Sequence, residues 1–256
     1  MTRRFSFETV DAVDYDELRP GYASEAVAWV VERGALGPTS LVVDLAAGTG
    51  QLSRHLDAMG VTPIAIEPAS NMRATLRDRV PSVRVMDAKA EALPFESGAV
   101  DAVVVGNAFH HFERDVAFRE IHRVLRNAGT LALFWAWPLE EEQRRVQGID
   151  AIYAAVERAR RDASIVAAYR SWADPPAKAG GFGPWERREF PLTHVVPSAR
   201  LADLYATSSD IGAMAPDDRA ALLAEIDELA RSLPETLRLP SRTVVDLCER
   251  AGTEGD

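Results

Sequence analysis

Residues 42–50, Val-Val-Asp-Leu-Ala-Ala-Gly-Thr-Gly, join an apolar strand pattern to a loop of very small residues that leads into a helix. Gly48 and Gly50 allow the loop to turn sharply and let a ligand approach the main chain. The helix that follows offers unpaired N–H groups at its start. The junction therefore predicts a loop that binds a cofactor.

Two positions bear on which cofactor the loop takes. A dinucleotide fingerprint, G-x-G-x-x-G, needs a glycine at position 53, and this chain has Ser53. Asp44, at the end of the strand, directs a carboxylate toward the loop, which suits an ammonium group better than a pyrophosphate. A nicotinamide-dependent reductase is therefore disfavoured, and no Tyr-x-x-x-Lys pair follows the fourth strand.

Composition narrows the class of protein. A chain of 256 residues with 47% hydrophobic residues can bury one large core, with or without an elaboration. The charge, 29 Lys and Arg against 39 Asp and Glu, is −10, which argues against nucleic-acid binding. The single cysteine, Cys248, excludes an internal disulfide. No long apolar run is present, so we expect no membrane association and a soluble, cytoplasmic protein.

Short strand patterns alternate with helical patterns after the loop. Strands are expected at 62–66, 83–86, 101–105 and 130–135, with a helix over 113–126 that ends at Asn127-Ala128-Gly129. Strands rich in Val, Ile and Leu without polar alternation are typical of a sheet covered on both faces. The pattern predicts an α/β fold with a doubly wound, mostly parallel sheet, whose ligand lies at the carboxyl ends of the strands.

Three further stretches lie at or near those strand ends, and a fourth lies at the end of the expected helix over 113–126. They are Ala65-Ile66-Glu67-Pro68-Ala69-Ser70-Asn71-Met72, Asp87-Ala88-Lys89-Ala90-Glu91-Ala92-Leu93-Pro94-Phe95, Asp101-Ala102-Val103-Val104-Val105-Gly106-Asn107-Ala108-Phe109-His110-His111-Phe112 and His122-Arg123-Val124-Leu125-Arg126-Asn127-Ala128-Gly129. With residues 42–50, in this order, they resemble the class I S-adenosylmethionine (SAM)-dependent methyltransferases with a type 11 methyltransferase domain. The resemblance runs from about residue 41 to residue 137.

The resemblance implies SAM as the cofactor and gives roles to individual residues. Ala46 stands where the family's first motif usually has glycine. Glu67 would take both ribose hydroxyls, and Met72 would lie on the adenine. Asp87 and the Ala88 N–H would read the edge of the base. The cofactor-binding positions expected in this core are Asp44, Ala46, Gly48, Gly50, Glu67, Met72, Asp87, Ala88 and Asn107.

An upstream segment has a resemblance of its own. Tyr15-Asp16-Glu17-Leu18-Arg19-Pro20-Gly21-Tyr22 is similar to a segment of trans-aconitate-methyltransferase-like enzymes that covers the methionine end of SAM. Arg19 is the expected clamp on the SAM carboxylate, because a planar guanidinium donates two parallel hydrogen bonds. Tyr15 and Tyr22 are expected to close over the pocket.

Each functional interpretation has a structural alternative. Asp44 and Glu67 could cap helices, Asp87 could be a turn residue, and Met72 could be core. His110 is the candidate general base facing the acceptor, and the alternative is a histidine that shapes the pocket. No metal is expected at His110-His111, since no metal-binding spacing is present.

The remainder of the chain carries no chemical motif. A helical pattern covers 139–169, a Pro- and Gly-rich break 174–184, a strand 185–196, a helix 215–232 and a last strand 241–248. We expect residues 1–138 to form the SAM-binding core with its N-terminal lid and residues 139–184 an inserted helical cap. Residues 185–256 would complete the sheet with an antiparallel edge.

These observations predict methyl transfer from SAM to an oxygen, nitrogen or carbon atom of a small-molecule acceptor, by a monomer or homodimer. The alternative is a SAM-binding, methyltransferase-like domain without activity, in a regulatory or scaffold role. The acceptor itself is left open, because a fold does not determine it.

Overall fold

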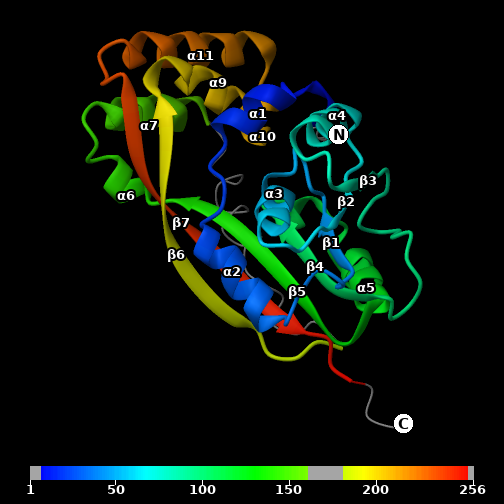
Figure 1. Ribbon diagram of the computed structural model, residues 1–256. Coiled ribbons are helices and arrows are strands. Elements are labelled where there is room, and N and C mark those ends of the chain that lie inside the picture. The colour runs from blue at the N-terminus through cyan, green and yellow to red at the C-terminus, as the bar shows by residue number, and fades with distance from the viewer. Residues whose placement is uncertain (1–6, 161–180, 253–256) are drawn as a thin grey trace.

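A single seven-stranded sheet organises the structure, a computed structural model that describes residues 7–160 and 181–252. The strand order is β3-β2-β1-β4-β5-β7-β6 (Figure 1). The first five strands in sequence are parallel, whereas β7 is antiparallel to β5 and β6 is antiparallel to β7. The predicted α/β fold, mostly parallel with an antiparallel C-terminal edge, is confirmed.

The predicted strands are all present, but β5 and β7 are each several residues longer than predicted, and the other boundaries differ by one or two residues. Their bounds are β1 Val42–Leu45, β2 Ile64–Ile66, β3 Arg84–Met86, β4 Val100–Gly106, β5 Leu125–Pro138, β6 Glu186–Pro197 and β7 Thr236–Glu249. Every residue of β1 is buried, as a strand between two covered faces requires.

Helices cover both faces of the parallel sheet. On one face, α2 (Ser24–Arg33) and α3 (Gln51–Ala58) pack against strand residues such as Val42 and Val104. On the other face, α5 (Arg114–Val124) packs against the alternate residues, among them Val43 and Val103. Because successive strand residues point to opposite faces, these apolar strands supply both cores. Next to β2 and β3, α4 (Ser70–Arg79) forms a smaller cluster.

The end of α5 differs from the prediction. The helix stops at Val124, and the chain enters β5 at Leu125, before the Asn127-Ala128-Gly129 sequence that was expected to end it. The pairing of β4 with β5 shifts register between Val100 and Ala102, and Ala128 adopts a left-handed φ of 56°. The turn residues therefore form an irregularity at the start of the strand rather than a helix cap.

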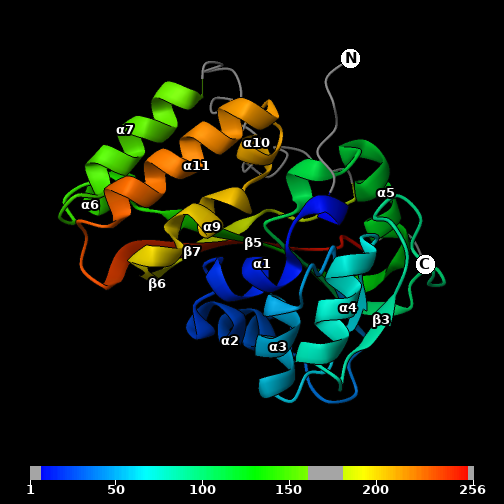
Figure 2. The same ribbon diagram turned by 90° about the horizontal axis from the view of Figure 1, so that it is seen from above.

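A layer of helices lies beyond the sheet (Figure 1) and is seen from above in Figure 2. It contains α6 (Glu140–Gln143), α7 (Ile149–Ala159), α9 (Leu201–Ala206), α10 (Ser209–Gly212) and α11 (Pro216–Ala230). Residues of α7, α9, α10 and α11 share one apolar cluster with the ends of β6 and β7. The expected cap, 139–184, contributes α6 and α7, and its residues 161–180 lie outside the described part of the chain. The domain boundaries stay a prediction.

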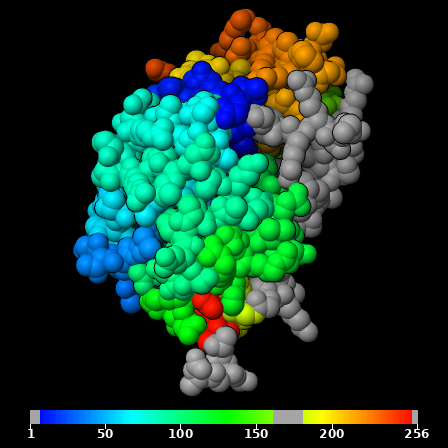
Figure 3. All heavy atoms as spheres, turned by 90° about the vertical axis from the view of Figure 1, so that its right-hand side faces the viewer, coloured from blue at the N-terminus to red at the C-terminus, as the bar shows by residue number. Residues whose placement is uncertain are grey.

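The N-terminal segment lies between this helical layer and the sheet. It contains η1 (Phe7–Thr9) and α1 (Ala12–Leu18). Helix α1 contacts α4 on one side and α9 on the other, and η1 contacts α4. Figure 3 shows the same segment, in blue, between α4 and the orange helices. Among the described residues, no helix has both the length and the apolar character that a membrane crossing requires.

Candidate functional site

The loop after β1 is built on left-handed backbone. Ala46, Gly48 and Gly50 have φ of 55°, 57° and 85°. The two glycines serve different purposes. A Cβ on Gly50 would lie 2.8 Å from Leu76 Cγ of α4, whereas a Cβ on Gly48 would meet nothing within 4 Å. Gly50 is therefore needed for packing, and Gly48 leaves its main chain open to a ligand.

Asp44 is buried at the end of β1 and is held from one side. Ser53 Oγ donates a hydrogen bond to Asp44 Oδ2 at 2.6 Å. The other oxygen, Oδ1, is buried and has no hydrogen-bond partner among the described residues, and the same is true of Thr49 Oγ1. Burial raises the pKa of Asp44 to about 7, against the lowering effect of Ser53. A cation beside Oδ1 would offset the cost of burying the ionised carboxylate.

Glu67 follows β2 and ties two loops together. Its carboxylate accepts the Gly48 N–H at 2.9 Å and the Ala69 N–H at 2.8 Å. Burial raises the pKa of Glu67, although both amide donors act to lower it. The acid expected to hold a ribose thus lies directly against the glycine loop, and it also fixes the position of that loop.

Asp87 and Met72 occupy contrasting positions. The Asp87 side chain is exposed and forms a 2.9 Å ion pair with Arg73, which also donates to the Glu67 carbonyl. Ala88, the next residue, is partly buried. Met72 is fully buried in a cluster with Val10 and other apolar residues. Its surroundings agree with the core alternative for this residue.

Tyr22 and Asn107 form a pair beneath the end of β4. Asn107 Nδ2 donates to the Tyr22 hydroxyl at 3.1 Å, and Asn107 Oδ1 accepts the Ala136 N–H at 2.9 Å. Tyr22 is buried, and its hydroxyl would lie 2.4 Å from a Cβ added to Gly106. Tyr22 therefore supports the tip of β4 from below, whereas it was expected to lie over the pocket.

Arg19 connects the N-terminal segment to the helical layer. Its Nη2 donates to the Thr207 carbonyl at 3.0 Å and to Ser208 Oγ at 3.3 Å. The guanidinium also lies over the Tyr15 ring, 5.4 Å from its centroid. Arg19 Nε is buried and has no hydrogen-bond partner within the described residues. A second donor of this guanidinium thus remains for a ligand.

One cavity brings several of the predicted residues together. It contains Tyr15, Arg19, Asn107 and His110. The described residues that line it are Phe7, Tyr15, Arg19, Pro20, Gln51, Asn107, His110, His111, Trp135, Ala136, Trp137 and Ser209. Neither Tyr22 nor Met72 reaches it. Gln51 and Ser209 were missed by sequence reasoning, because no motif marks them and only the fold carries them to the cavity.

His110 stands at the tip of β4 on η2 (Phe109–His111). Its ring is stacked on that of Trp135, with centroids 5.9 Å apart and planes at 29°. Burial is the main cause that lowers the pKa of His110 to about 3, and the charges of His111, Arg114 and Arg19 act in the same direction. The imidazole is therefore neutral near pH 7, and its conjugate acid is too acidic for an efficient general base.

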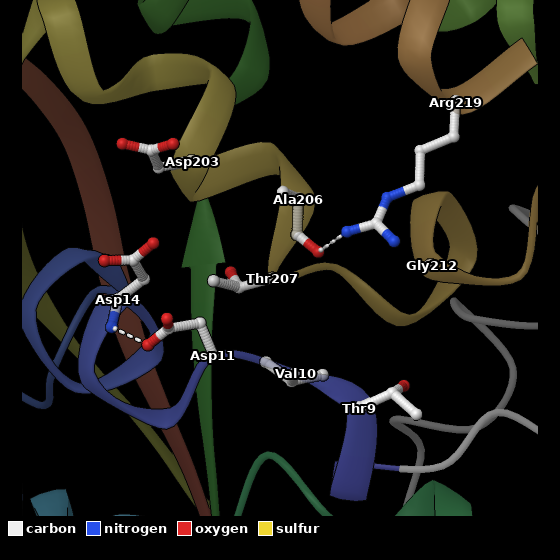
Figure 4. Close-up of a pocket in the computed structure, with 9 residues that line it drawn as sticks. All are labelled: Thr9, Val10, Asp11, Asp14, Asp203, Ala206, Thr207, Gly212 and Arg219. Carbon is white, nitrogen blue, oxygen red and sulfur yellow. Dashed lines mark hydrogen bonds between the residues drawn. The ribbon is translucent and has the colours of Figure 1, made fainter. Parts of the chain in front are cut away.

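A second cavity lies on the far side of Thr207 (Figure 4) and has a volume of about 240 Å³. Three carboxylates reach it, but each has a structural partner. Asp11 caps α1 by accepting N–H groups from Val13 and Asp14, and both Asp14 and Asp203 pair with Arg200. These contacts account for the acids, and none of the predicted site residues lines this cavity.

The central part of the chain matches a known protein family. A family model described as a methyltransferase domain matches residues 43–133, from β1 to β5. A methyltransferase-like protein of Schizosaccharomyces pombe, described as uncharacterized, is 29% identical over 244 residues, which cover 95% of this chain and 91% of the relative. An uncharacterized methyltransferase of Mycobacterium tuberculosis is 36% identical over 121 residues, 47% of this chain. The matched region spans about half the length of that relative.

Solved structures agree on the fold. A structure from Anaeromyxobacter dehalogenans, described as a type II methyltransferase, superimposes with a TM-score of 0.64 at 21% identity, covering 91% of this chain and 98% of the other. A Haemonchus contortus phosphoethanolamine N-methyltransferase, solved with S-adenosylhomocysteine, gives a TM-score of 0.51 at 13% identity, covering 94% and 57%. These two structures share the fold of this chain.

Proposed function

We propose that this chain, whose residues 43–133 match a methyltransferase domain, is a class I SAM-dependent methyltransferase. It transfers the methyl group of SAM to a small organic acceptor bound in the cavity between η2, β5 and the N-terminal segment. The observation that carries the proposal is the buried Asp44 carboxylate. One of its oxygens has no hydrogen-bond partner among the described residues, beside a glycine loop whose main chain is open.

The residues around the β1 loop fit SAM. Asp44 Oδ1 and Thr49 Oγ1 are buried acceptors without partners in the described structure, and the ammonium group of the methionine moiety can supply hydrogen bonds to such atoms. Gly48 permits close approach of the cofactor to the main chain. Glu67 lies one hydrogen bond from that glycine, at the place proposed for the ribose.

The outer positions are assigned on the same basis. Asp87, with the Ala88 N–H, is proposed for the adenine edge, where the Asp87 carboxylate is exposed and reachable. Arg19 is proposed for the methionine carboxylate, because its Nε is buried without a partner in the described chain and Tyr15 holds the guanidinium plane. Met72 is assigned to packing and Tyr22 to support of Asn107.

Bound SAM supplies an electrophilic methyl group on a sulfonium. The protein then has to align the acceptor in line with that methyl and exclude water. Trp135 and Trp137, stacked with centroids 6.2 Å apart, provide an apolar wall for alignment. Arg19 and its hydrogen bonds to Thr207 and Ser208 close the cavity toward the helical layer. His110 shapes the wall as a neutral ring.

Ligand-dependent stability tests the proposal. SAM and S-adenosylhomocysteine should each raise the melting temperature. At a ligand concentration of one hundred times the dissociation constant, the free energy of unfolding should increase by about 2.7 kcal/mol. NADP should have no effect. Arg19→Met should weaken S-adenosylhomocysteine binding about tenfold or more through loss of a charge-assisted hydrogen bond. Arg231→Met, at an exposed ion pair with Glu228, is the control. Stabilisation by NADP alone would refute the proposal.

A further inference from the structure

The lining of the cavity beside the proposed methyl position is aromatic and lacks acids. Six of its residues carry aromatic rings, namely Phe7, Tyr15, His110, His111, Trp135 and Trp137. None of the described residues that line it is Asp or Glu. A flat, apolar ligand would bury its faces against this wall, because aromatic surfaces prefer offset or edge contacts with other rings.

One donor in the wall has no partner. Trp135 is only 4% exposed, and its indole N–H is buried without a hydrogen-bond acceptor among the described residues. A buried indole N–H usually has an acceptor, because an unmet donor in an apolar environment is costly. Since Trp135 lines the cavity, an oxygen atom of a bound ligand can accept a hydrogen bond from this N–H group.

Cationic side chains lie in and beside the cavity. Arg19 lines it, and the charges of Arg19 and Arg114 both disfavour protonation of His110. A bound sulfonium adds a further positive charge at the methyl position. An ammonium acceptor would meet repulsion there, whereas an anion would be attracted.

We propose that the acceptor is an aryl oxyanion, a single aromatic ring that carries a phenolate or carboxylate oxygen. The ring packs against Trp135 and Trp137, and the oxygen accepts the Trp135 N–H. This proposal rests on the proposed function, since it assumes a sulfonium donor in the adjacent site. The oxygen lone pair forms the new O–CH₃ bond while the C–S bond breaks. The products are an aryl methyl ether or ester and S-adenosylhomocysteine, and no proton is transferred.

The competing possibility is an amine, because aromatic cages also bind cations through their ring faces. Two features argue against an amine: no Asp or Glu is among the described residues that line the cavity, and the Arg19 guanidinium lines it. An amine would also need to lose a proton before attack, and the neutral His110 is a weak acceptor of that proton. Amine preference is therefore the result that would overturn the proposal.

The test is calorimetry on the full chain saturated with S-adenosylhomocysteine, with three probes of similar ring size. The probes are 4-nitrophenolate, benzoate and benzylammonium. The phenolate or the benzoate, or both, should bind at least tenfold more tightly than benzylammonium, and the stronger anion identifies the kind of oxygen. Equal affinity, tighter binding of benzylammonium, or no binding of either anion would overturn the proposal. S-adenosylhomocysteine binding in the same experiment reports separately on the proposed function.

The Trp135 N–H is tested by Trp135→Phe, which keeps a ring and removes the donor. A hydrogen bond to a charged group predicts about a tenfold or greater loss of anion affinity, with unchanged S-adenosylhomocysteine binding. Trp29→Phe, the same change on α2 outside the cavity, is the matched control and should alter neither. If the folded Trp135→Phe variant binds the anion as tightly as the wild-type protein does, the indole N–H of Trp135 does not donate to the ligand. Should Trp135→Phe fail to fold, the probe preference of the wild-type protein still decides the proposal.

Discussion

Ser53 Oγ donates a 2.6 Å hydrogen bond to Asp44 Oδ2, and both side chains are buried. Ser53 occupies the position where a dinucleotide fingerprint would have glycine. In this chain the serine fastens α3 to the end of β1 and engages one oxygen of the acid. The other oxygen is buried and has no hydrogen-bond partner among the described residues. The serine that replaces the fingerprint glycine at position 53 therefore helps to fix the Asp44 side chain.

The burial of Asp44 should appear in the pH dependence of stability. Its pKa is raised from 3.8 to about 7, so the folded state binds a proton that the unfolded state has lost. The stabilisation is complete below about pH 4 and disappears as the pH rises through 7. Asp44→Asn removes this dependence, and should gain roughly 2 to 4 kcal/mol relative to wild type between pH 4 and pH 8.

Urea unfolding of both proteins at several pH values measures that difference. Asp57→Asn is the control, because hydrogen bonds from Thr62 and Ser82 lower the pKa of Asp57. Its stability difference from wild type should not change between pH 5 and pH 8. Parallel curves for wild type and Asp44→Asn would show that Asp44 is ionised in the folded protein at all these values.

The two loop glycines should respond differently to alanine. Both have positive φ, so each substitution strains the backbone by about 1 kcal/mol or more. Gly50→Ala also forces a Cβ against Leu76, and should lower the free energy of unfolding further. Gly48→Ala meets open space, and should mainly weaken S-adenosylhomocysteine binding. Equal effects of both changes on stability and affinity would contradict this division.

Loss of the Glu67 carboxylate should affect both stability and affinity. Glu67→Ala leaves the Gly48 and Ala69 N–H groups without their acceptor, which costs about 1 to 3 kcal/mol of stability for a buried donor. Affinity for S-adenosylhomocysteine should fall about tenfold or more, through the ribose contact. Asp57→Ala, which removes two hydroxyl contacts elsewhere, should keep wild-type affinity. Unchanged affinity in folded Glu67→Ala would leave Glu67 a purely structural role.

His110 should remain neutral over the physiological range. Its pKa is lowered to about 3, mainly by burial, so nuclear magnetic resonance should show no titration of its ring between pH 5 and pH 8. His110→Ala should lower turnover through the shape of the cavity, without altering the pH profile between pH 6 and pH 8. A ring midpoint near 6.5, or a limb of the profile that disappears in His110→Ala, would restore the general-base role.

Several expectations about the site depended on neighbours that a sequence pattern does not reveal. Residues at the ends of parallel strands were correctly expected at one edge of the sheet, and Gly48 indeed lies beside Glu67. Met72 and Tyr22 were marked by their motifs, yet the structure buries Met72 in a cluster with Val10 and places Tyr22 under Asn107. Motif spacing locates a residue along the chain, whereas the packing of distant segments decides which way its side chain faces.

The sequence by itself determined the alternating α/β order, the parallel sheet with its antiparallel edge, and the glycine loop after the first strand. These features follow from local periodicity and from conformations that glycine favours. Tertiary structure alone decided that Ser53 holds Asp44, that Arg19 binds Thr207, and that Trp135 keeps a buried N–H beside the cavity. Burial and hydrogen bonding between residues far apart in the chain set these properties, so no local pattern records them.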